Sequence, residues 1–123
     1  MKLDVGDYGC LYQNGQEAPL YFERKSLSDL FGTLGKGHRR FKREIERAKA
    51  SNATLVMLIE GTLSDVYRGL PQSEVKGEAV VKKLATLYMK YDIIPIFMPD
   101  RLEMVQFIRE CFEAIGRLEK SKP

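Results

Sequence analysis

The chain has 123 residues, of which 44% are hydrophobic and 30% are charged, so we expect one globular domain with a real core and no disordered chain. No apolar run approaches the length of a membrane span, and the N-terminus lacks the apolar segment of a secretory signal. Cys10 and Cys111 are too few and too far apart to indicate a disulfide framework or a zinc site. These features predict an intracellular protein without a membrane partner, in the cytoplasm, nucleoid or nucleus depending on the source.

Two short strands, at residues 3–7 and 20–25, are expected first, with turn residues between them. The simplest pairing of the two strands is an antiparallel ribbon. Because side chains alternate along a strand, Glu23 and Lys25 share one face, and Asp7 can converge on the same point. Two carboxylates beside a lysine are typical of a Mg²⁺ or Mn²⁺ site for phosphodiester hydrolysis. There the metal activates water, and the lysine orients that water or stabilises developing charge.

A short helix is expected directly after the second strand. Its predicted range runs from Asp29 to Leu34, and either Ser26 or Ser28 could cap it. Glycine at residue 35 ends it. The strand with the charged pair is therefore expected to lead straight into a helix.

The next helix, expected at residues 38–50, is strongly basic. Its core positions are Phe41, Ile45 and Ala48, so the arginines lie on an outward stripe. Residues 36–49 carry seven basic and two acidic side chains, a net charge of +5, which indicates either contact with a polyanion such as nucleic acid or a merely solvated face. The expected DNA-contacting residues are Lys36, His38, Arg39, Arg40, Arg43 and Arg47.

A continuous aliphatic run from Thr54 to Ile59 predicts a buried central strand. Glu60 follows at the carboxyl edge, where α/β sheets place their sites. Glu60 is therefore either a third carboxylate near the metal or a strand end exposed to solvent.

The second half of the chain is expected to alternate between helix and strand. A short helix at 63–68 precedes a long amphipathic helix from Ser73 to Lys90, with Ser73 as its cap and an inward stripe that includes Tyr88. A strand at 93–98 follows.

A final helix capped by Asp100 carries more apolar residues than one core-facing stripe needs, and residues 118–123 are expected to form a frayed tail. The excess predicts contact with a second copy of the chain. The apolar residues are Leu102, Val105, Ile108, Phe112 and Ile115.

The order of strands and helices predicts a single α/β domain over residues 1–123. Helices are expected on both faces of a central mixed sheet, which gives three layers, α/β/α.

The motif around the first two strands resembles a known nuclease family. Gly6-Asp7, then Glu23-Arg24-Lys25 and Asp29, is similar to the signature of the XPF/Hef structure-specific endonucleases, within the restriction-endonuclease-like PD-(D/E)xK superfamily. Leu58-Ile59-Glu60 and Ile94-Pro95-Ile96-Phe97 extend the resemblance. It implies a restriction-endonuclease-like fold and metal-dependent cleavage of branched or otherwise structured DNA during repair or recombination.

The resemblance also implies roles for single residues. Asp7 and Glu23 would hold Mg²⁺ or Mn²⁺, and Lys25 would act on the water or the phosphate. Arg24 and Asp29 are motif positions expected to brace the site by pairing with each other or with neighbouring groups. The implied partners are double-stranded or branched DNA and a second copy of the chain in a homodimer.

The sequence departs from the family in two respects. Nuclease domains of the family begin with a further strand and helix whose first acid contributes to the metal site, and Asp4 lies on the wrong strand face to replace it. Either the chain is a fragment, another chain supplies that strand, or fewer acids hold the metal. The helix-hairpin-helix module of many relatives is also absent. A catalytically silent DNA-binding or scaffold member of the fold is therefore the alternative to an active nuclease.

Overall fold

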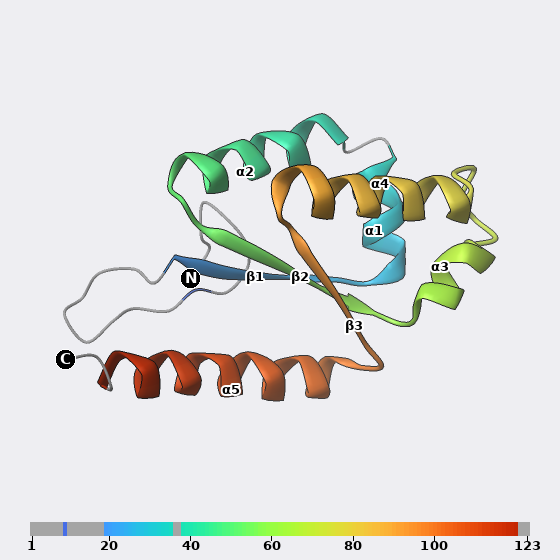
Figure 1. Ribbon diagram of the computed structural model, residues 1–123. Helices are drawn as coiled ribbons and strands as arrows, with labels where there is room; N and C mark the ends of the chain where they lie inside the picture. Colours follow the sequence, from blue (N-terminus) through green and yellow to red (C-terminus); the bar gives the residue numbers. More distant parts are fainter. Residues whose placement is uncertain (1–8, 10–18, 36–37, 121–123) are drawn as a thin grey trace.

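The computed structural model describes residues 9, 19–35 and 38–120 (Figure 1). Three strands form one parallel sheet in the order β1-β2-β3, so their carboxyl ends lie at the same edge. Leu20 lies opposite Thr54 in the first pairing, and Val56 lies opposite Ile94 in the second. The strands are β1 (Leu20–Lys25), β2 (Thr54–Glu60) and β3 (Ile94–Met98).

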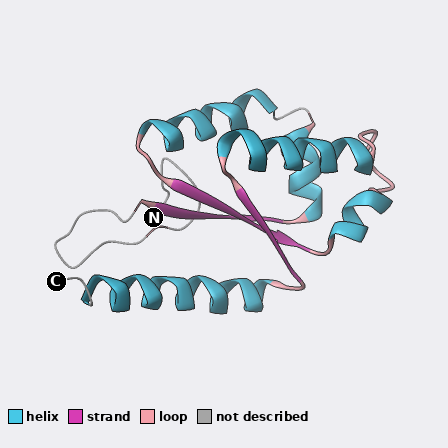
Figure 2. Cartoon of the chain, viewed as in Figure 1, coloured by secondary structure: helices cyan, strands magenta, loops and turns pink. Residues whose placement is uncertain are grey.

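Both connections between the strands run over the same face of the sheet. The first contains α1 (Leu27–Leu34) and α2 (His38–Ala50), and the second contains α3 (Leu63–Arg68) and α4 (Gly77–Tyr91). Crossovers between parallel strands are right-handed, and both connections step across the sheet in the same direction, so their helices gather on one side. Of the described helices, α5 (Arg101–Lys120) alone covers the other side (Figures 1 and 2). The predicted α/β/α layering is confirmed.

Alternation along β2 divides the core into two clusters. Met57 and Ile59 pack toward the four connecting helices, whereas Val56 and Leu58 pack toward α5. On the α5 side, the rings of Phe22 and Phe112 meet edge to face, with their centroids 5.6 Å apart. A strand buried on both faces matches the continuous apolar run of its sequence.

Side chains cap the first and last helices. The Ser26 hydroxyl oxygen accepts a hydrogen bond from the Asp29 backbone N–H at 3.1 Å, so α1 begins two residues before the predicted start. The Asp100 carboxylate accepts from the Glu103 N–H at 2.9 Å, as predicted. Each cap satisfies a backbone donor that has no partner within the helix.

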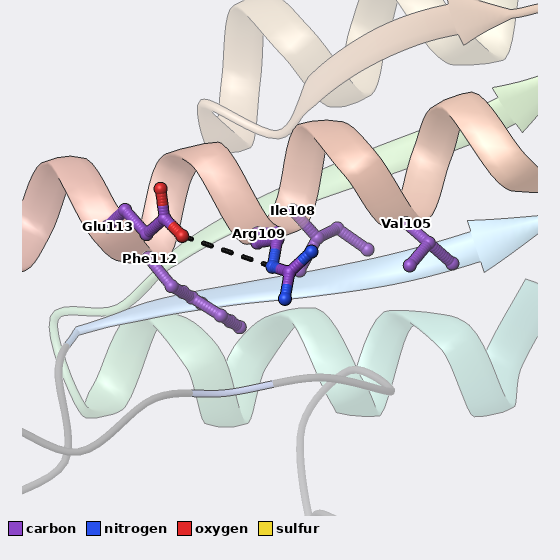
Figure 3. Close-up of a pocket in the computed structure, with 5 residues that line it drawn as sticks. All are labelled: Val105, Ile108, Arg109, Phe112 and Glu113. Atoms are coloured by element: carbon purple, nitrogen blue, oxygen red, sulfur yellow. Dashed lines mark ion pairs between the residues drawn. The ribbon is translucent and has the colours of Figure 1, made fainter.

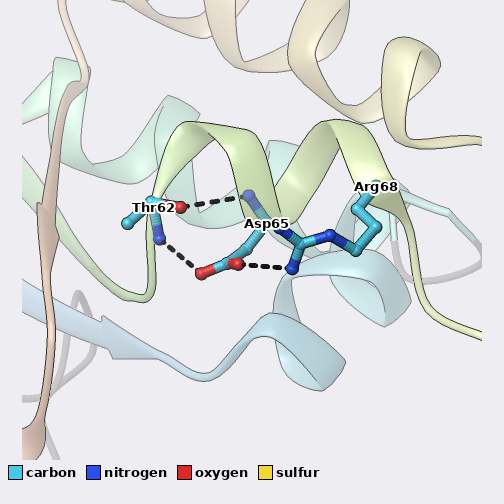
Figure 4. A network of polar contacts seen from close by, with 3 residues as sticks. All are labelled: Thr62, Asp65 and Arg68. Atoms are coloured by element: carbon cyan, nitrogen blue, oxygen red, sulfur yellow. Dashed lines mark hydrogen bonds and ion pairs between the residues drawn. The ribbon is translucent and has the colours of Figure 1, made fainter.

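A reciprocal cap begins α3 (Figure 4). The Asp65 N–H donates to Thr62 Oγ1 at 3.1 Å, and the Thr62 N–H donates to Asp65 Oδ2 at 3.0 Å. Arg68 Nη1 donates to the other carboxylate oxygen at 2.9 Å. The bonds from Thr62, and then the Arg68 charge, hold the pKa of Asp65 below its usual value.

The start of α4 differs from the prediction. The helix begins at Gly77, four residues after Ser73, and the Ser73 hydroxyl oxygen accepts from the Val75 N–H in a turn. The cause is a tertiary contact: a β-carbon on residue 77 would collide with the carbonyl oxygens of Val66 and Tyr67. The first residue of α4 can therefore pack against the end of α3 only if it is glycine.

Two further expectations are corrected. Tyr88, predicted to face inward, is 49% exposed, because the buried stripe of α4 is formed by Val80, Leu84 and Leu87 and Tyr88 lies at its margin. Helix α5 continues to Lys120, so residues 118–120 belong to the helix and not to a tail. No helix in the described part of the chain is long and apolar enough to cross a membrane.

The predicted ribbon between residues 3–7 and β1 lies outside the described residues. The strands that the structure does describe are parallel, so the mixed character of the sheet stays a prediction.

Candidate active site

Glu23 and Lys25 lie side by side at the carboxyl end of β1. Their Oε1 and Nζ atoms are 3.7 Å apart, and their side chains are 9% and 16% exposed. Both alternate with Phe22, which packs toward α5, so they point to the face that α1 and α2 cover. Partial burial strengthens the attraction between the two charges relative to a surface pair. The structure thus brings together the carboxylate and the ammonium that strand alternation predicted.

A polar cavity of about 400 Å³ opens beside Lys25, between α1 and α2. Its charged walls come from three elements: Lys25 from β1, Asp29 from α1, and Arg40 and Glu44 from α2. Two basic and two acidic groups therefore surround a space open to solvent. The remaining lining residues are Ser28, Gly32, Thr33 and Phe41.

The outward face of α2 is basic, as predicted. Arg40, Arg43 and Arg47 are exposed, whereas Phe41 and Ile45 are buried. The three arginines line a shallow surface cavity of about 560 Å³ together with Glu46 and Ala50. Arg40 lines this cavity and the polar one beside Lys25, so the basic face is continuous with the Glu23–Lys25 pair.

Three other predicted DNA-contacting residues precede Arg40. Arg39 is exposed on α2. Lys36 lies outside the described residues, and His38 begins α2 with a side chain that is not described.

Some predicted neighbours are not brought together. Arg24 pairs in register with Leu58, whose side chain packs toward α5, so it lies on the opposite face of β1 from the Asp29 cavity. Arg24 and Asp29 therefore lie on different faces of β1 and are not paired in the described salt bridges, and bracing of the site through neighbouring groups stays a prediction. Glu60 is exposed and alternates with Ile59, which places it on the α5 face, away from Glu23.

Of the two expected metal ligands, Glu23 lies at the end of β1 and Asp7 lies outside the described residues. Within the described ranges, no three acidic, histidine or cysteine side chains are close enough together to hold a metal. Glu23 nevertheless offers hard carboxylate oxygens, the donors that Mg²⁺ and Mn²⁺ prefer, at the strand end beside a polar cavity. The Glu23 carboxylate therefore fits as one ligand of such an ion.

Sequence reasoning missed the contributions of Glu44 and Phe41 to the cavity. Glu44 follows Arg40 by four residues and so shares its helix face, which was a usable signal. Phe41 was predicted only as a core residue, and its ring lies under the Lys25 ammonium with Nζ 5.9 Å from the ring centroid.

The chain is similar to known proteins both in sequence and in structure. The ERCC4 domain profile matches residues 1–111. XPF from Aeropyrum pernix matches with a TM-score of 0.68 and 21% identity, over 98% of this chain and 55% of that chain. XPF from Aeropyrum pernix in complex with DNA matches with a TM-score of 0.60 and 24% identity, over 98% and 52%. No curated protein matches the chain.

The chain thus spans about half the length of these XPF chains, and at this identity the likeness shows a common fold. The profile match covers most of the sequence and includes the strand that carries Glu23 and Lys25. The chain therefore belongs to the ERCC4 domain family, the family of XPF-type structure-specific DNA endonucleases.

Proposed function

We propose that this domain is a Mg²⁺- or Mn²⁺-dependent endonuclease that cleaves branched or otherwise structured DNA in repair or recombination. The observation that carries the proposal is the Glu23–Lys25 pair, 3.7 Å apart at a strand end and joined through Arg40 to a basic helix face. The pair supplies groups for phosphodiester hydrolysis, and the helix supplies groups that bind the polyanion.

In this proposal Asp7 and Glu23 hold the metal ion. When bound, the ion lowers the pKa of a water molecule and offsets phosphate charge. Lys25 orients the attacking water or stabilises charge on the phosphate from its position beside Glu23. Asp29 contributes a carboxylate to the cavity wall, and Arg24 supports β1 from its other face.

The basic face of α2 binds the DNA backbone. Phosphate contacts fix the position of a protein on DNA without reading its sequence, as a nuclease that recognises DNA structure requires. A solved chain of the same fold, XPF from Aeropyrum pernix, is in complex with DNA, which supports DNA binding in general. The contacting residues in the proposal are Lys36, His38, Arg39, Arg40, Arg43 and Arg47.

We also propose that the domain forms a homodimer through α5. An apolar cavity of about 440 Å³ on this helix is lined by Val105, Ile108 and Phe112, with the Arg109–Glu113 ion pair at its side (Figure 3). Leu102, one turn before Val105, is 67% exposed. In a two-fold dimer each copy presents the same surface, so apolar residues meet and Arg109 and Glu113 can exchange partners.

The deciding experiment is a cleavage assay on linear and branched DNA of the same sequence, with Mg²⁺, Mn²⁺ or a chelator. Glu23→Gln should abolish metal-dependent cleavage and leave the fold intact, because it removes a charge at almost constant shape. Glu60→Gln is the matched control, since Glu60 ends the neighbouring strand on the other face and should retain activity.

Two outcomes would contradict the proposal. Full activity of Glu23→Gln would remove the metal assignment. DNA binding by the wild-type protein without cleavage in either metal would favour the alternative, a catalytically silent DNA-binding or scaffold member of the fold.

A further inference from the structure

We propose that Phe41 is a positioning residue, whose ring holds the Lys25 ammonium in place beside the cavity. The inference rests on the function proposed for Lys25. The ammonium nitrogen lies over the ring, 5.9 Å from its centroid, within the range in which an aromatic face attracts a cation. The two side chains come from different elements, β1 and α2, so the contact depends on the packing of the helix against the sheet.

The Phe41 ring is itself held firmly. It is 3% exposed, and with Leu34, Ile45 and Leu87 it lines a separate cavity of about 200 Å³ between α2 and α4. Lys42, Lys83 and Lys90 also line this cavity, so the ring lies between it and the polar cavity beside Lys25. Its burial among the other core side chains limits the rotamers open to the ring, so it can serve as a support.

Lys25 benefits from such a support because Glu23, its ion-pair partner among the described residues, restrains it weakly. The 3.7 Å separation of Nζ and Oε1 is longer than a good hydrogen bond, and four rotatable bonds allow the ammonium to swing around a single attachment point. Contacts from two directions define its position. An aromatic face attracts the charge without accepting a conventional hydrogen bond, so the N–H groups can still donate to a group in the cavity that Lys25 lines. A leucine of similar apolar character lacks this attraction.

The test compares Phe41→Leu, Phe41→Tyr and a control, Phe31→Leu. Phe31 is equally buried at 3% in the same cluster, and no described cation lies over its ring. We expect Phe41→Leu to lower kcat about tenfold with DNA affinity within twofold, and Phe41→Tyr to restore kcat, because the aromatic face returns. Phe31→Leu should lower thermal stability to a similar extent and leave kcat unchanged below the transition. Unchanged kcat in Phe41→Leu, or an equal loss in Phe31→Leu, would overturn the proposal.

A second measurement does not depend on cleavage. With ¹³C-labelled lysine, the ring current of Phe41 should shift the Lys25 ε-methylene signal upfield in the wild-type protein and in Phe41→Tyr, and the shift should vanish in Phe41→Leu. Lys25→Met identifies the signal. If the wild-type protein cleaves no DNA while the shift is present, the proposed nuclease function fails but the contact stands. A Lys25 signal without an upfield shift in the wild-type protein would overturn the positioning role.

Discussion

The backbone of Gly77, at the start of α4, lies directly against the carbonyl oxygen of Val66 in α3. A β-carbon at residue 77 would also meet the Tyr67 carbonyl. Backbone on both sides of the contact leaves no flexible side chain that could move aside. The junction of the two helices therefore depends on one glycine.

We expect Gly77→Ala to lower the free energy of unfolding by about 1–3 kcal/mol, the usual effect of forcing atoms into a packed site. Urea denaturation measures this directly. Gly116→Ala in α5 is the control: apart from its own helix backbone and chain neighbours, no described atom lies within 4 Å of its added β-carbon, so better helix propensity should stabilise the protein by about 1 kcal/mol. Equal effects of the two substitutions would contradict the tight contact.

Asp65 should make stability depend on acid pH. Its pKa is lowered in the folded state by the hydrogen bonds from Thr62 and by Arg68, so its contribution is present above the unfolded pKa, near 3.8, and is lost as the pH falls through the folded value. Asp65→Asn keeps an acceptor for the cap but cannot titrate. Its Tm should therefore fall less steeply than that of the wild-type protein below about pH 4. Parallel Tm curves for the two proteins would show that Asp65 contributes nothing.

Lys25→Ala should reduce turnover more than DNA affinity. A group that acts on developing charge contributes mainly in the transition state, so we expect kcat to fall about 10²-fold with a nearly constant Kd for DNA. Single-turnover cleavage and fluorescence anisotropy measure the two quantities. Lys82→Ala is the control for a simple loss of positive charge, because the Lys82 side chain is exposed on α4. If Lys25→Ala weakened binding alone, Lys25 would be a phosphate anchor.

Charge reversal on α2 should weaken binding to all DNA sequences alike. Each phosphate contact that is lost reduces the slope of log K against log salt by about 0.9, so Arg43→Glu should flatten the salt dependence by about that amount. Titrations at several salt concentrations measure the slope. Lys82→Glu changes the same charge on α4 and should leave the slope nearly unchanged. Equal slopes for wild type and Arg43→Glu would show that this face does not contact DNA.

The dimer is best tested at residues that the monomer core does not need. Phe112 packs on Phe22, so its substitution would confuse dissociation with unfolding. Val105 is 48% exposed, and Val105→Glu should convert a dimer to a monomer with unchanged far-ultraviolet circular dichroism. Met89→Glu, at a 77% exposed site on α4, is the control and should stay dimeric. Light scattering that finds the wild-type protein monomeric at high micromolar concentration would exclude the dimer.

The elements that the sequence predicts well are those fixed by local patterns. The bounds of α2 and α3 and the burial of β2 follow from apolar periodicity, and Glu23 and Lys25 meet because they are two residues apart on one strand. The start of α4 was missed because it depends on the contact between Gly77 and α3, whereas a serine such as Ser73 can cap a turn as readily as a helix.

In the candidate site, too, some features follow from local sequence patterns and others from tertiary packing. The place of Phe41 under Lys25 follows from how α2 packs on the sheet, which no local pattern encodes. The separation of Arg24 from Asp29 could have been predicted. Strand alternation already places Arg24 on the other face of β1 from Glu23 and Lys25, and Asp29 lies on the Lys25 side. Glu60 is excluded from the Glu23 face by the same alternation along β2.

Helix α5 is the one described helix on its face of the sheet, and this position bears on how the protein opens locally. The described strands pair with one another and not with α5, so α5 can detach from the sheet without breaking a hydrogen bond between these strands. Amide hydrogens in α5 should then exchange through a partial opening, whereas those of β2, paired on both sides, should exchange only when the whole domain unfolds. The surface that this opening uncovers is the apolar one around Phe22 and Leu58.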